Sequence, residues 1–342
     1  MAIAAPGIAV LLVAGGCATV NPSSRTPSPT LATHSPPVAT AAGSTPTESP
    51  SPSLEIAAPP GTPPPLAGSF PLVNSCDPTS VPGAIPVAAP AGGKASSFVL
   101  HVPILMYHRI VPIAEAGNSL PGLVVPPQTF AAQLDALAGA GWHTITMATL
   151  ANDLQAHVNP LAKSFVITID DGWDDGYSYA LPILEKHAFV ATYFVIAGYI
   201  DNPGFLSSAH LRALVAAGDE IGDHTMDHLS LSRQPAAKLP YEIDAAAARI
   251  AQVTGYWPES LAYPYGGFDS QAAAAVAACQ ELRIAAIEAP LEIEKPVASG
   301  TPQVTVMPAA YETWAYRFVV PRIRVSPSTT PAYLLAELDR YR

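Results

Sequence analysis

The sequence has few charged residues. Asp, Glu, Lys and Arg make up 13% of its 342 residues, whereas hydrophobic types make up 49%. Basic residues are scarcer than acidic ones: 16 Lys and Arg stand against 27 Asp and Glu, which gives a net charge of −11. An acidic chain is repelled by nucleic acid and by anionic membrane surfaces, so we expect neither as a partner. The apolar content suffices for a sizeable core in one large domain or two ordinary ones.

Positive charge is absent from the start of the chain, where the first basic residue is Arg25. Export signals usually begin with basic residues, and none is present here. The position of the true start codon is therefore not assigned. The opening "MAIAAPGIAVLLVAGGCATV" nevertheless has an apolar stretch of signal-peptide length, too short to span a bilayer. Small residues directly precede Cys17, which resembles a bacterial lipobox. We expect a lipoprotein-type signal over 1–17 and export to the cell membrane or surface, anchored through lipid on Cys17. An ordinary secretory signal is the alternative.

Large apolar side chains are scarce in the next stretch, residues 18–66, which is dominated by Pro, Ser, Thr and Ala. Such a composition cannot bury enough apolar surface to offset the entropy of the chain. We expect a disordered tether here. Residues 67–100 would then lead into a folded domain over 101–342.

Cysteine is also rare, with three copies. Besides Cys17, the chain has Cys76 and Cys279. In an oxidising envelope these two could form a disulfide between the leading segment and a late helix. Two unpaired thiols are the alternative.

From Val102 onward, apolar strand patterns alternate with helical ones. Strands are expected at 102–108, 143–146, 164–170, 189–197, 219–225, 259–266, 283–288, 301–308 and 316–325. Helices are expected at 126–141, 147–157, 179–188, 207–218, 238–255, 269–280 and 331–342. This order implies a mostly parallel sheet, closed or curled under a layer of helices. In such folds the chemistry lies at the carboxyl ends of the strands.

Polar motifs follow several of these strands. Asp170 and Asp171 end the apolar run of "FVITIDDG", and two adjacent carboxylates repel unless a cation lies beside them. "GDHTMDH" supplies His224 and His228, whose spacing places both imidazoles on one side of a helical turn. Two histidines and one carboxylate leave open positions on a metal, which is typical of a catalytic site.

The motifs "TIDDG", "HTMDH" and "AYPYG" resemble those of the polysaccharide deacetylases, the NodB-homology carbohydrate esterases. The resemblance covers about residues 102–324. It implies an α/β fold, a distorted (β/α) barrel with about seven strands. It also implies metal-dependent removal of acetyl groups, usually from N-acetylglucosamine units of a glycan. Separately, we expect the protein to be a monomer.

The resemblance also assigns roles to single residues. It implies one divalent ion, zinc first and cobalt, nickel, iron or manganese as alternatives, with Asp170 as general base. The ligands would be Asp171, His224 and His228. The backbone N–H of Tyr265, next to Pro264, would serve the oxyanion together with the ion.

The chain departs from the family pattern in two places. The arginine that orients the base is replaced by Ala262, and no histidine follows His228 to act as the acid. "ILMYH" near the domain's start resembles a branch acting on exported poly-N-acetylglucosamine, in which the late strand is permuted to the front. His108 would then be the acid, and Arg322 or Arg324 would replace the missing arginine.

Other readings remain open. Two histidines and a carboxylate also bind non-heme iron in oxygenases, commonly in all-β folds. A non-catalytic glycan-binding lipoprotein and a metal-dependent peptidoglycan hydrolase are further alternatives. Among the aromatic residues, Trp173, Tyr177 and Tyr263 are either core or platforms for sugar rings.

Overall fold

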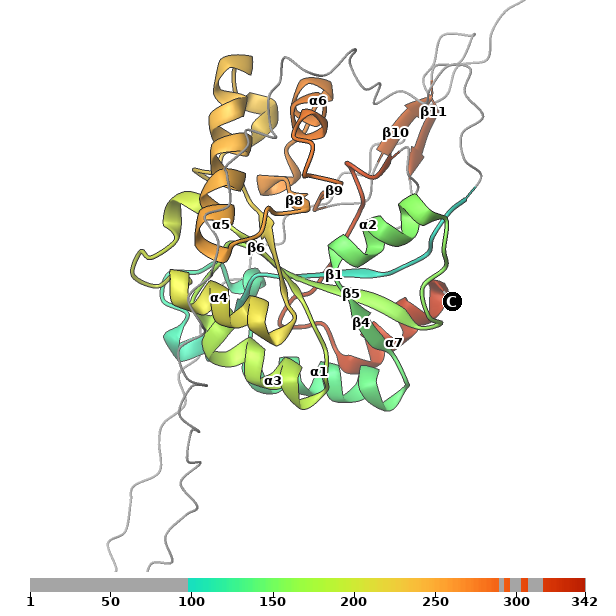
Figure 1. Cartoon of the computed structure of the whole chain (residues 1–342). Helices are drawn as coiled ribbons and strands as arrows, with labels where there is room; N and C mark the ends of the chain where they lie inside the picture. The colour runs from blue at the N-terminus through green and yellow to red at the C-terminus, as the bar shows by residue number, and fades with distance from the viewer. Residues whose placement is uncertain (1–97, 289–291, 296–302, 307–315, 342) are drawn as a thin grey trace, which may run out of the picture. The chain divides into compact units, whose positions relative to one another are not determined.

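The alternating pattern folds into β/α units. The computed structural model describes residues 98–288, 292–295, 303–306 and 316–341 (Figure 1). The strands are β1 (Ile104–Tyr107), β2 (Arg109–Ile110), β3 (Val124–Val125), β4 (His143–Ile145), β5 (Ser164–Ile169), β6 (Thr192–Val195), β7 (Glu220–Asp223), β8 (Ser260–Ala262), β9 (Ile284–Ala286), β10 (Glu292–Lys295), β11 (Gln303–Val306) and β12 (Ile323–Arg324). The α-helices are α1 (Pro127–Gly139), α2 (Met147–Ala156), α3 (Leu181–Lys186), α4 (Ser208–Ala217), α5 (Ala246–Thr254), α6 (Ser270–Ala278) and α7 (Pro331–Leu338).

The main sheet is parallel and has the strand order β12-β1-β5-β6-β7-β8-β9, with β4 added beside β5. Its two ends meet at a parallel bridge between Ala286 of β9 and Val320, which precedes β12. Two hydrogen bonds make this bridge: Val320 N–H donates to the carbonyl of Ala285, and Ile287 N–H donates to that of Val320, both at 2.9 Å. We call residues 320–324 the seam. The predicted distorted barrel with about seven strands is confirmed.

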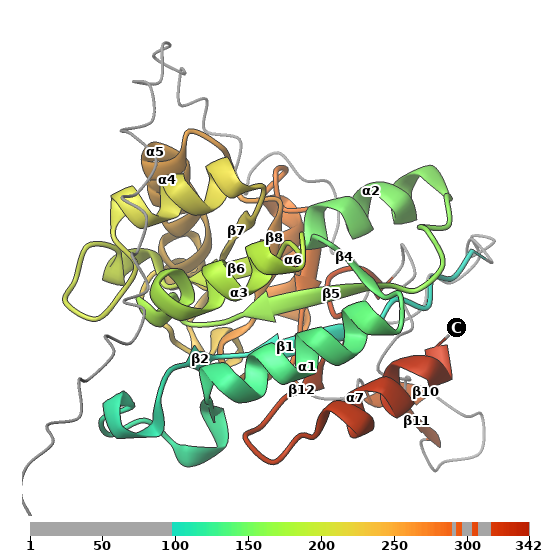
Figure 2. The same ribbon diagram turned by 90° about the horizontal axis from the view of Figure 1, so that it is seen from below.

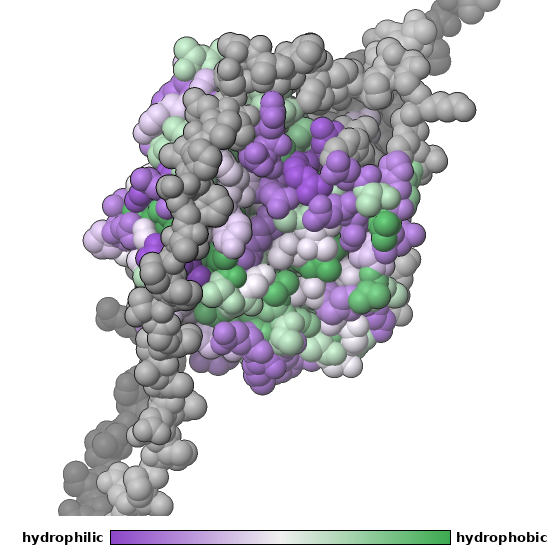
Figure 3. Space-filling model, in the orientation of Figure 1, coloured by the Kyte–Doolittle hydropathy of each residue, from purple (hydrophilic) through white to green (hydrophobic). Residues whose placement is uncertain are grey.

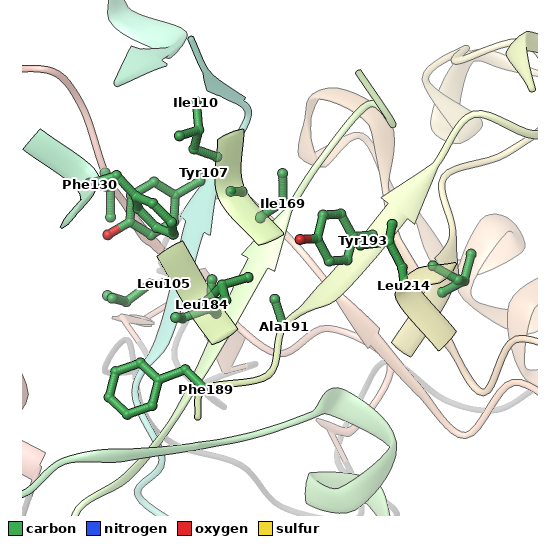
Figure 4. Packing of buried hydrophobic residues seen from close by; sticks show 14 of the residues in the cluster. Leu105, Tyr107, Ile110, Phe130, Ile169, Leu184, Phe189, Ala191, Tyr193 and Leu214 are labelled. Carbon is green, nitrogen blue, oxygen red and sulfur yellow. The ribbon is translucent and has the colours of Figure 1, made fainter. Parts of the chain in front are cut away.

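Helices cover the outside of this curled sheet (Figures 1 and 2). Helix α1 lies beside α7, and α4 packs against α5. Phe130, Leu134 and Leu137 are fully buried on one face of α1, as their spacing predicts. Figure 4 shows Phe130 against Tyr107 of β1, where the rings meet edge to face with 5.0 Å between centroids. This layer is the larger part of the core.

The alternation of side chains along each strand decides which residues reach the barrel interior. Ile104 of β1, Val166 of β5 and Phe194 of β6 belong to one inner cluster. Continuing the alternation from Ile104 and Val166 turns His108 and Asp170 inward, and both follow the carboxyl ends of their strands. The strand register places Met106 opposite Thr168, so these two inward positions are neighbours. Strand geometry alone therefore gathers polar groups at one end of the barrel.

Some elements are shorter than the sequence predicts. The strand expected at 316–325 is regular only at Ile323–Arg324. The helix expected at 238–255 begins with a π-helical turn at Tyr241–Ala245 before it becomes α5. The parallel, helix-covered sheet also differs from the all-β folds that commonly carry the iron-oxygenase site.

Several predictions fall outside the described residues: the signal over 1–17 with Cys17, the tether over 18–66 and Cys76. Cys279 is fully buried and disulfide-bonded.

None of the helices within the described residues has the length and apolar character needed to cross a bilayer. Hydrophilic and hydrophobic side chains are interspersed on the face of the domain in Figure 3.

Candidate active site

A cavity of about 270 Å³ opens at the carboxyl end of the barrel strands. Its walls come from segments far apart in the sequence. The lining residues are Met106, His108, Leu120, Leu123, Asp170, Asp171, His224, His228, Tyr263, Tyr265, Gly266, Glu288, Arg322 and Arg324. The fold thus brings nearly all the predicted site residues to one place.

Asp170 is held by a buried arginine. Arg322 donates from Nη1 to Oδ1 and from Nη2 to Oδ2 of Asp170, both at 2.7 Å. The two side chains are only 3% and 1% exposed. Burial by itself would raise the pKa of Asp170, but the Arg322 guanidinium and the nearby histidines hold it below its usual range. Asp170 is therefore an anion at neutral pH, and the bidentate hydrogen bonding from Arg322 fixes its orientation.

The two arginine candidates have different positions. Arg322 lies in the seam, where Nε also donates to the carbonyl of Ile287 at 3.1 Å and Nη1 to Thr168 Oγ1 at 3.0 Å. Arg324 instead forms an ion pair with Glu288 at the cavity rim. The guanidinium that contacts Asp170 thus comes from Arg322, and the suggestion that Arg324 orients the base is wrong.

Asp171, His224 and His228 form a second group beside Asp170. Asp171 Oδ1 lies 3.5 Å from His224 Nε2 and 3.3 Å from His228 Nε2. One potential ligand atom from each residue lies within 4.8 Å of the others. Burial would raise the pKa of Asp171, but the contacts with both histidines lower it well below its usual range. Asp171 has a positive φ of 75°, which turns it away from the direction of Asp170.

The donor set is suited to a divalent cation. The Nδ1 of His224 lies 2.8 Å from the carbonyl of Ala262, which fixes Nδ1 as the protonated nitrogen and aims the Nε2 lone pair at Asp171. Two imidazole nitrogens directed at one carboxylate oxygen need positive charge among them. Zinc takes such ligands at about 2.0–2.2 Å in sites that keep an open position. These residues therefore fit a site for a divalent metal ion.

The two histidines are not on a helical turn, contrary to the sequence prediction. His224 directly follows β7 and the chain then forms a tight loop, with positive φ at Thr225 (67°) and His228 (57°). Asp223 Oδ1 accepts from Thr225 N–H at 2.7 Å, and Thr225 Oγ1 accepts from His228 N–H at 3.1 Å. These short-range bonds to side chains replace helical ones, and they still bring the two rings to 4.8 Å between centroids.

A buried glutamate supports the same loop. Glu242 is fully buried, and its Oε2 accepts from Asp227 N–H at 3.1 Å. Its backbone carbonyl accepts from Met226 N–H at 3.0 Å. Lys238 forms an ion pair with Oε1 at 3.1 Å. No motif in the sequence points to Glu242, because the loop that it supports lies 15 residues earlier in the chain.

His108 lines the cavity where β1 ends. Burial lowers its pKa below the ordinary value, although the carboxylates of Asp170 and Asp171 act in the opposite direction. A lowered pKa makes the protonated imidazole a stronger acid and restricts that form to lower pH. His108 is thus placed to give or take a proton in the cavity that also holds Asp170.

The third motif lines the cavity with Tyr263, Tyr265 and Gly266. Pro264 is buried, and Tyr265 is 69% exposed with a positive φ of 59°. The Tyr265 ring lies 4.7 Å from that of His228. Tyr263 is buried and belongs to a hydrophobic cluster, so it is core rather than a sugar platform.

Trp173 has a position that its sequence context does not reveal. Its ring stacks on Phe205 at 4.4 Å with a 21° interplanar angle, while the Arg109 guanidinium carbon lies 4.2 Å from the same ring. The two groups are too close to the ring to share one face, so both faces are covered. Trp173 therefore cannot stack on a sugar. Tyr177 stacks on His210 at 4.2 Å.

Comparison with known proteins identifies relatives. Residues 157–282 match the family model described as polysaccharide deacetylase. YxkH of Bacillus subtilis, whose name assigns it to the polysaccharide deacetylases, is 30% identical over 170 residues, which are 50% of this chain and 58% of YxkH. PgdA of Listeria monocytogenes, named as a peptidoglycan-N-acetylglucosamine deacetylase, is 29% identical over 32% of this chain and 23% of PgdA. The chain thus spans less than two thirds of these curated relatives.

A solved structure shares the fold. The deacetylase PplD of Streptococcus pyogenes, in complex with acetate, superposes with a TM-score of 0.58 at 22% identity. The match covers 69% of this chain and 97% of PplD. The fold is therefore of a known type.

Proposed function

We propose that this chain, of which residues 157–282 match the polysaccharide deacetylase family model, is a metal-dependent hydrolase of N-acetyl groups. Its substrate would be an N-acetylglucosamine-containing polysaccharide of the cell envelope or the extracellular space. One observation supports this proposal above the others: a fixed carboxylate and a potential metal site share one cavity. Arg322 donates two hydrogen bonds to the Asp170 carboxylate, and the potential metal ligands Asp171, His224 and His228 lie next to it.

The ligand set would be Asp171 and the two histidines, and zinc is the ion we propose first, because catalytic zinc sites use histidine and carboxylate ligands and keep one position open. When bound there, a divalent ion supplies an acidified water, with a pKa near ~7, and a polarised acetamide carbonyl. The remaining chemistry belongs to the side chains. Asp170, ionised and fixed by Arg322, accepts the proton of the water as its oxygen attacks the acetyl carbon. The C–O bond forms as the carbonyl π electrons move to oxygen.

The oxyanion and the leaving amine need further groups. The backbone N–H of Tyr265, beside Pro264, would donate to the developing oxyanion. The C–N bond then breaks, and the amine nitrogen takes up a proton. We assign that proton to His108, which shares the cavity with Asp170 and follows the neighbouring strand. A strand that carries the acid at the front of the domain also favours the permuted branch acting on poly-N-acetylglucosamine.

An acetate-release assay tests the function. The purified domain, loaded with zinc, should release acetate from N-acetylglucosamine oligomers, and a chelator should stop the release. Asp170→Asn should abolish turnover while zinc content stays near that of the wild type. Asp174→Asn is the matched control, because Asp174 pairs with His210 rather than with a cavity residue. Zinc-loaded wild type that releases no acetate from any acetylated glycan would favour the binding-module alternative, and cut glycan or peptide would favour the peptidoglycan hydrolase.

The proposed location is the outer face of the cell membrane, with the protein monomeric and anchored through Cys17. This rests on the small residues before Cys17 and on the composition of the tether. Cys17→Ser should move the protein out of the membrane fraction or leave it unprocessed. Unchanged fractionation and mass of that variant would exclude the anchor.

A further inference from the structure

The two oxygens of the Asp171 carboxylate have different partners. Oδ1 is the atom that faces His224 Nε2 and His228 Nε2. Oδ2 accepts a hydrogen bond from the indole Nε1 of Trp173 at 3.1 Å. A carboxylate that binds a cation through one oxygen retains charge and lone pairs on the other, and a donor there sets the orientation of the whole group.

The indole that provides this donor has little freedom to move. Phe205 stacks on one face of Trp173 and also pairs with it through an isolated antiparallel bridge. The Arg109 guanidinium covers the other face at 4.2 Å. A ring enclosed on both sides keeps its N–H direction fixed, so the bond to Asp171 is preformed.

Arg109 is itself fixed from two sides. It forms an ion pair with the buried Asp175, and its Nη1 donates to Ser119 Oγ at 2.6 Å. Asp175 Oδ1 also accepts from Ile110 N–H at 3.0 Å. Arg109 directly follows His108, so one rigid arrangement joins the strand end that carries His108 to the indole behind Asp171.

We propose that Trp173 is a positioning residue, whose indole N–H fixes the Asp171 carboxylate in the orientation that binds the metal. This rests on the metal site of the proposed function and adds a residue outside the ligand set. Partners of this kind change metal affinity by about 10–100-fold when they are removed. The role requires the N–H, and ring volume alone does not supply it.

Trp173→Phe tests the contribution of the indole N–H separately from that of the aromatic ring. Phenylalanine lacks the N–H but can retain the stack between Phe205 and Arg109. The matched control is Trp142→Phe. Trp142 is 3% exposed and its Nε1 has no hydrogen-bond partner, so this variant removes a buried indole N–H that makes no bond. Zinc dissociation constants of both purified variants are measured against a chromophoric chelator. Near-UV circular dichroism and thermal unfolding of the metal-free proteins check the fold.

We expect Trp173→Phe to bind zinc about 10-fold more weakly or worse, and Trp142→Phe to bind it as the wild type does. Equal affinity of folded Trp173→Phe and wild type would overturn the proposal and leave the metal site intact. A wild type that binds no zinc would overturn the metal site and this proposal together. Because binding is measured without turnover, these outcomes are separate from the absence of deacetylation.

If Trp173→Phe does not fold, the wild type can still be tested by NMR. The chain has four tryptophans, and substituting the other three assigns the ¹⁵N-labelled indole signal of Trp173 by elimination. Zinc should shift that signal, and its N–H should exchange slowly with solvent. A Trp173 signal that zinc leaves unchanged would overturn the proposal.

Discussion

Ala262 stands where the corresponding motif of the polysaccharide deacetylases, which this chain resembles, has an arginine, and Arg322 supplies a guanidinium from the seam. The side chain of Ala262 is fully buried and makes no polar contact with Asp170. The backbone carbonyl of Ala262 still serves the site, because it accepts a hydrogen bond from His224. Arg322 reaches Asp170 with both terminal nitrogens and is itself fixed by Ile287 and Thr168. At the scale of single residues, the orientation of the Asp170 carboxylate depends on the guanidinium of Arg322 and on the hydrogen bonds that fix this guanidinium.

Arg322→Met should show the importance of this pair. Removing the guanidinium leaves Asp170 buried without its cation, which should lower the free energy of unfolding by about 3–5 kcal/mol. It should also raise the pKa of Asp170, so the base is protonated over a wider acidic range and the acid limb of kcat/KM moves to higher pH. Urea unfolding and pH–rate profiles measure both effects. Arg324→Met, at the exposed rim, is the control, and equal effects of the two variants would contradict the assignment.

His108→Ala tests the proposed acid. Turnover should fall by ~10²–10⁴, the range for a lost general acid, with zinc affinity nearly unchanged. Because burial lowers the pKa of His108, the protonated form is lost below the ordinary value of ~6.5, and the alkaline limb of wild-type kcat/KM should begin there. That limb should be flat in His108→Ala. An active variant that retains the limb would return the acid role to Asp170.

At the scale of elements, the sequence predicted much of the barrel. Most strand–helix units appear where the apolar periodicity places them, because burial on one face imposes that period. The His224–His228 loop was mispredicted, since a four-residue spacing suits a helix and nothing in the motif reports the positive φ of Thr225. The contact between Arg109 and Asp175 spans 66 positions, and periodicity does not encode which loops meet at a barrel rim.

Asp219, at the turn from α4 into β7, should make stability depend on pH. Burial raises its pKa to about 7, because only Oδ1 is bonded, to Ala191 N–H, and Oδ2 has no partner. The folded state therefore binds a proton that the unfolded state releases above pH ~4. Stability from this group is present below pH ~4 and is lost as pH rises to about 7, by at most about 4 kcal/mol at ~1.4 kcal/mol per pH unit.

Asp219→Asn should remove this dependence, since asparagine stays neutral and can still accept from Ala191. Urea unfolding of wild type and variant at several values between pH 4 and pH 7.5 measures the difference in slope. Parallel stability curves would show that Asp219 is ionised in the folded protein across this range.

At the scale of the whole molecule, Cys279 is engaged in a disulfide bond. We expect its partner to be Cys76. Non-reducing peptide mapping should find one cross-linked peptide that contains both. Cys76→Ser should free the Cys279 thiol and lower the free energy of unfolding by about 2–5 kcal/mol, whereas Cys17→Ser should leave the bond intact. A free Cys279 thiol in the wild type would refute the pairing.

The closure of the barrel at its seam has a consequence for biosynthesis. Asp170 and Arg322 lie 152 positions apart, so at ~5–20 residues per second the arginine leaves the ribosome roughly 8–30 s after the aspartate. Until then the nascent chain has its acidic and histidine motifs but an open ring and an unpaired Asp170. Closure of the ring and the pairing of Asp170 with Arg322 therefore follow synthesis of the seam, and the cavity is complete only after both of these distant segments have left the ribosome.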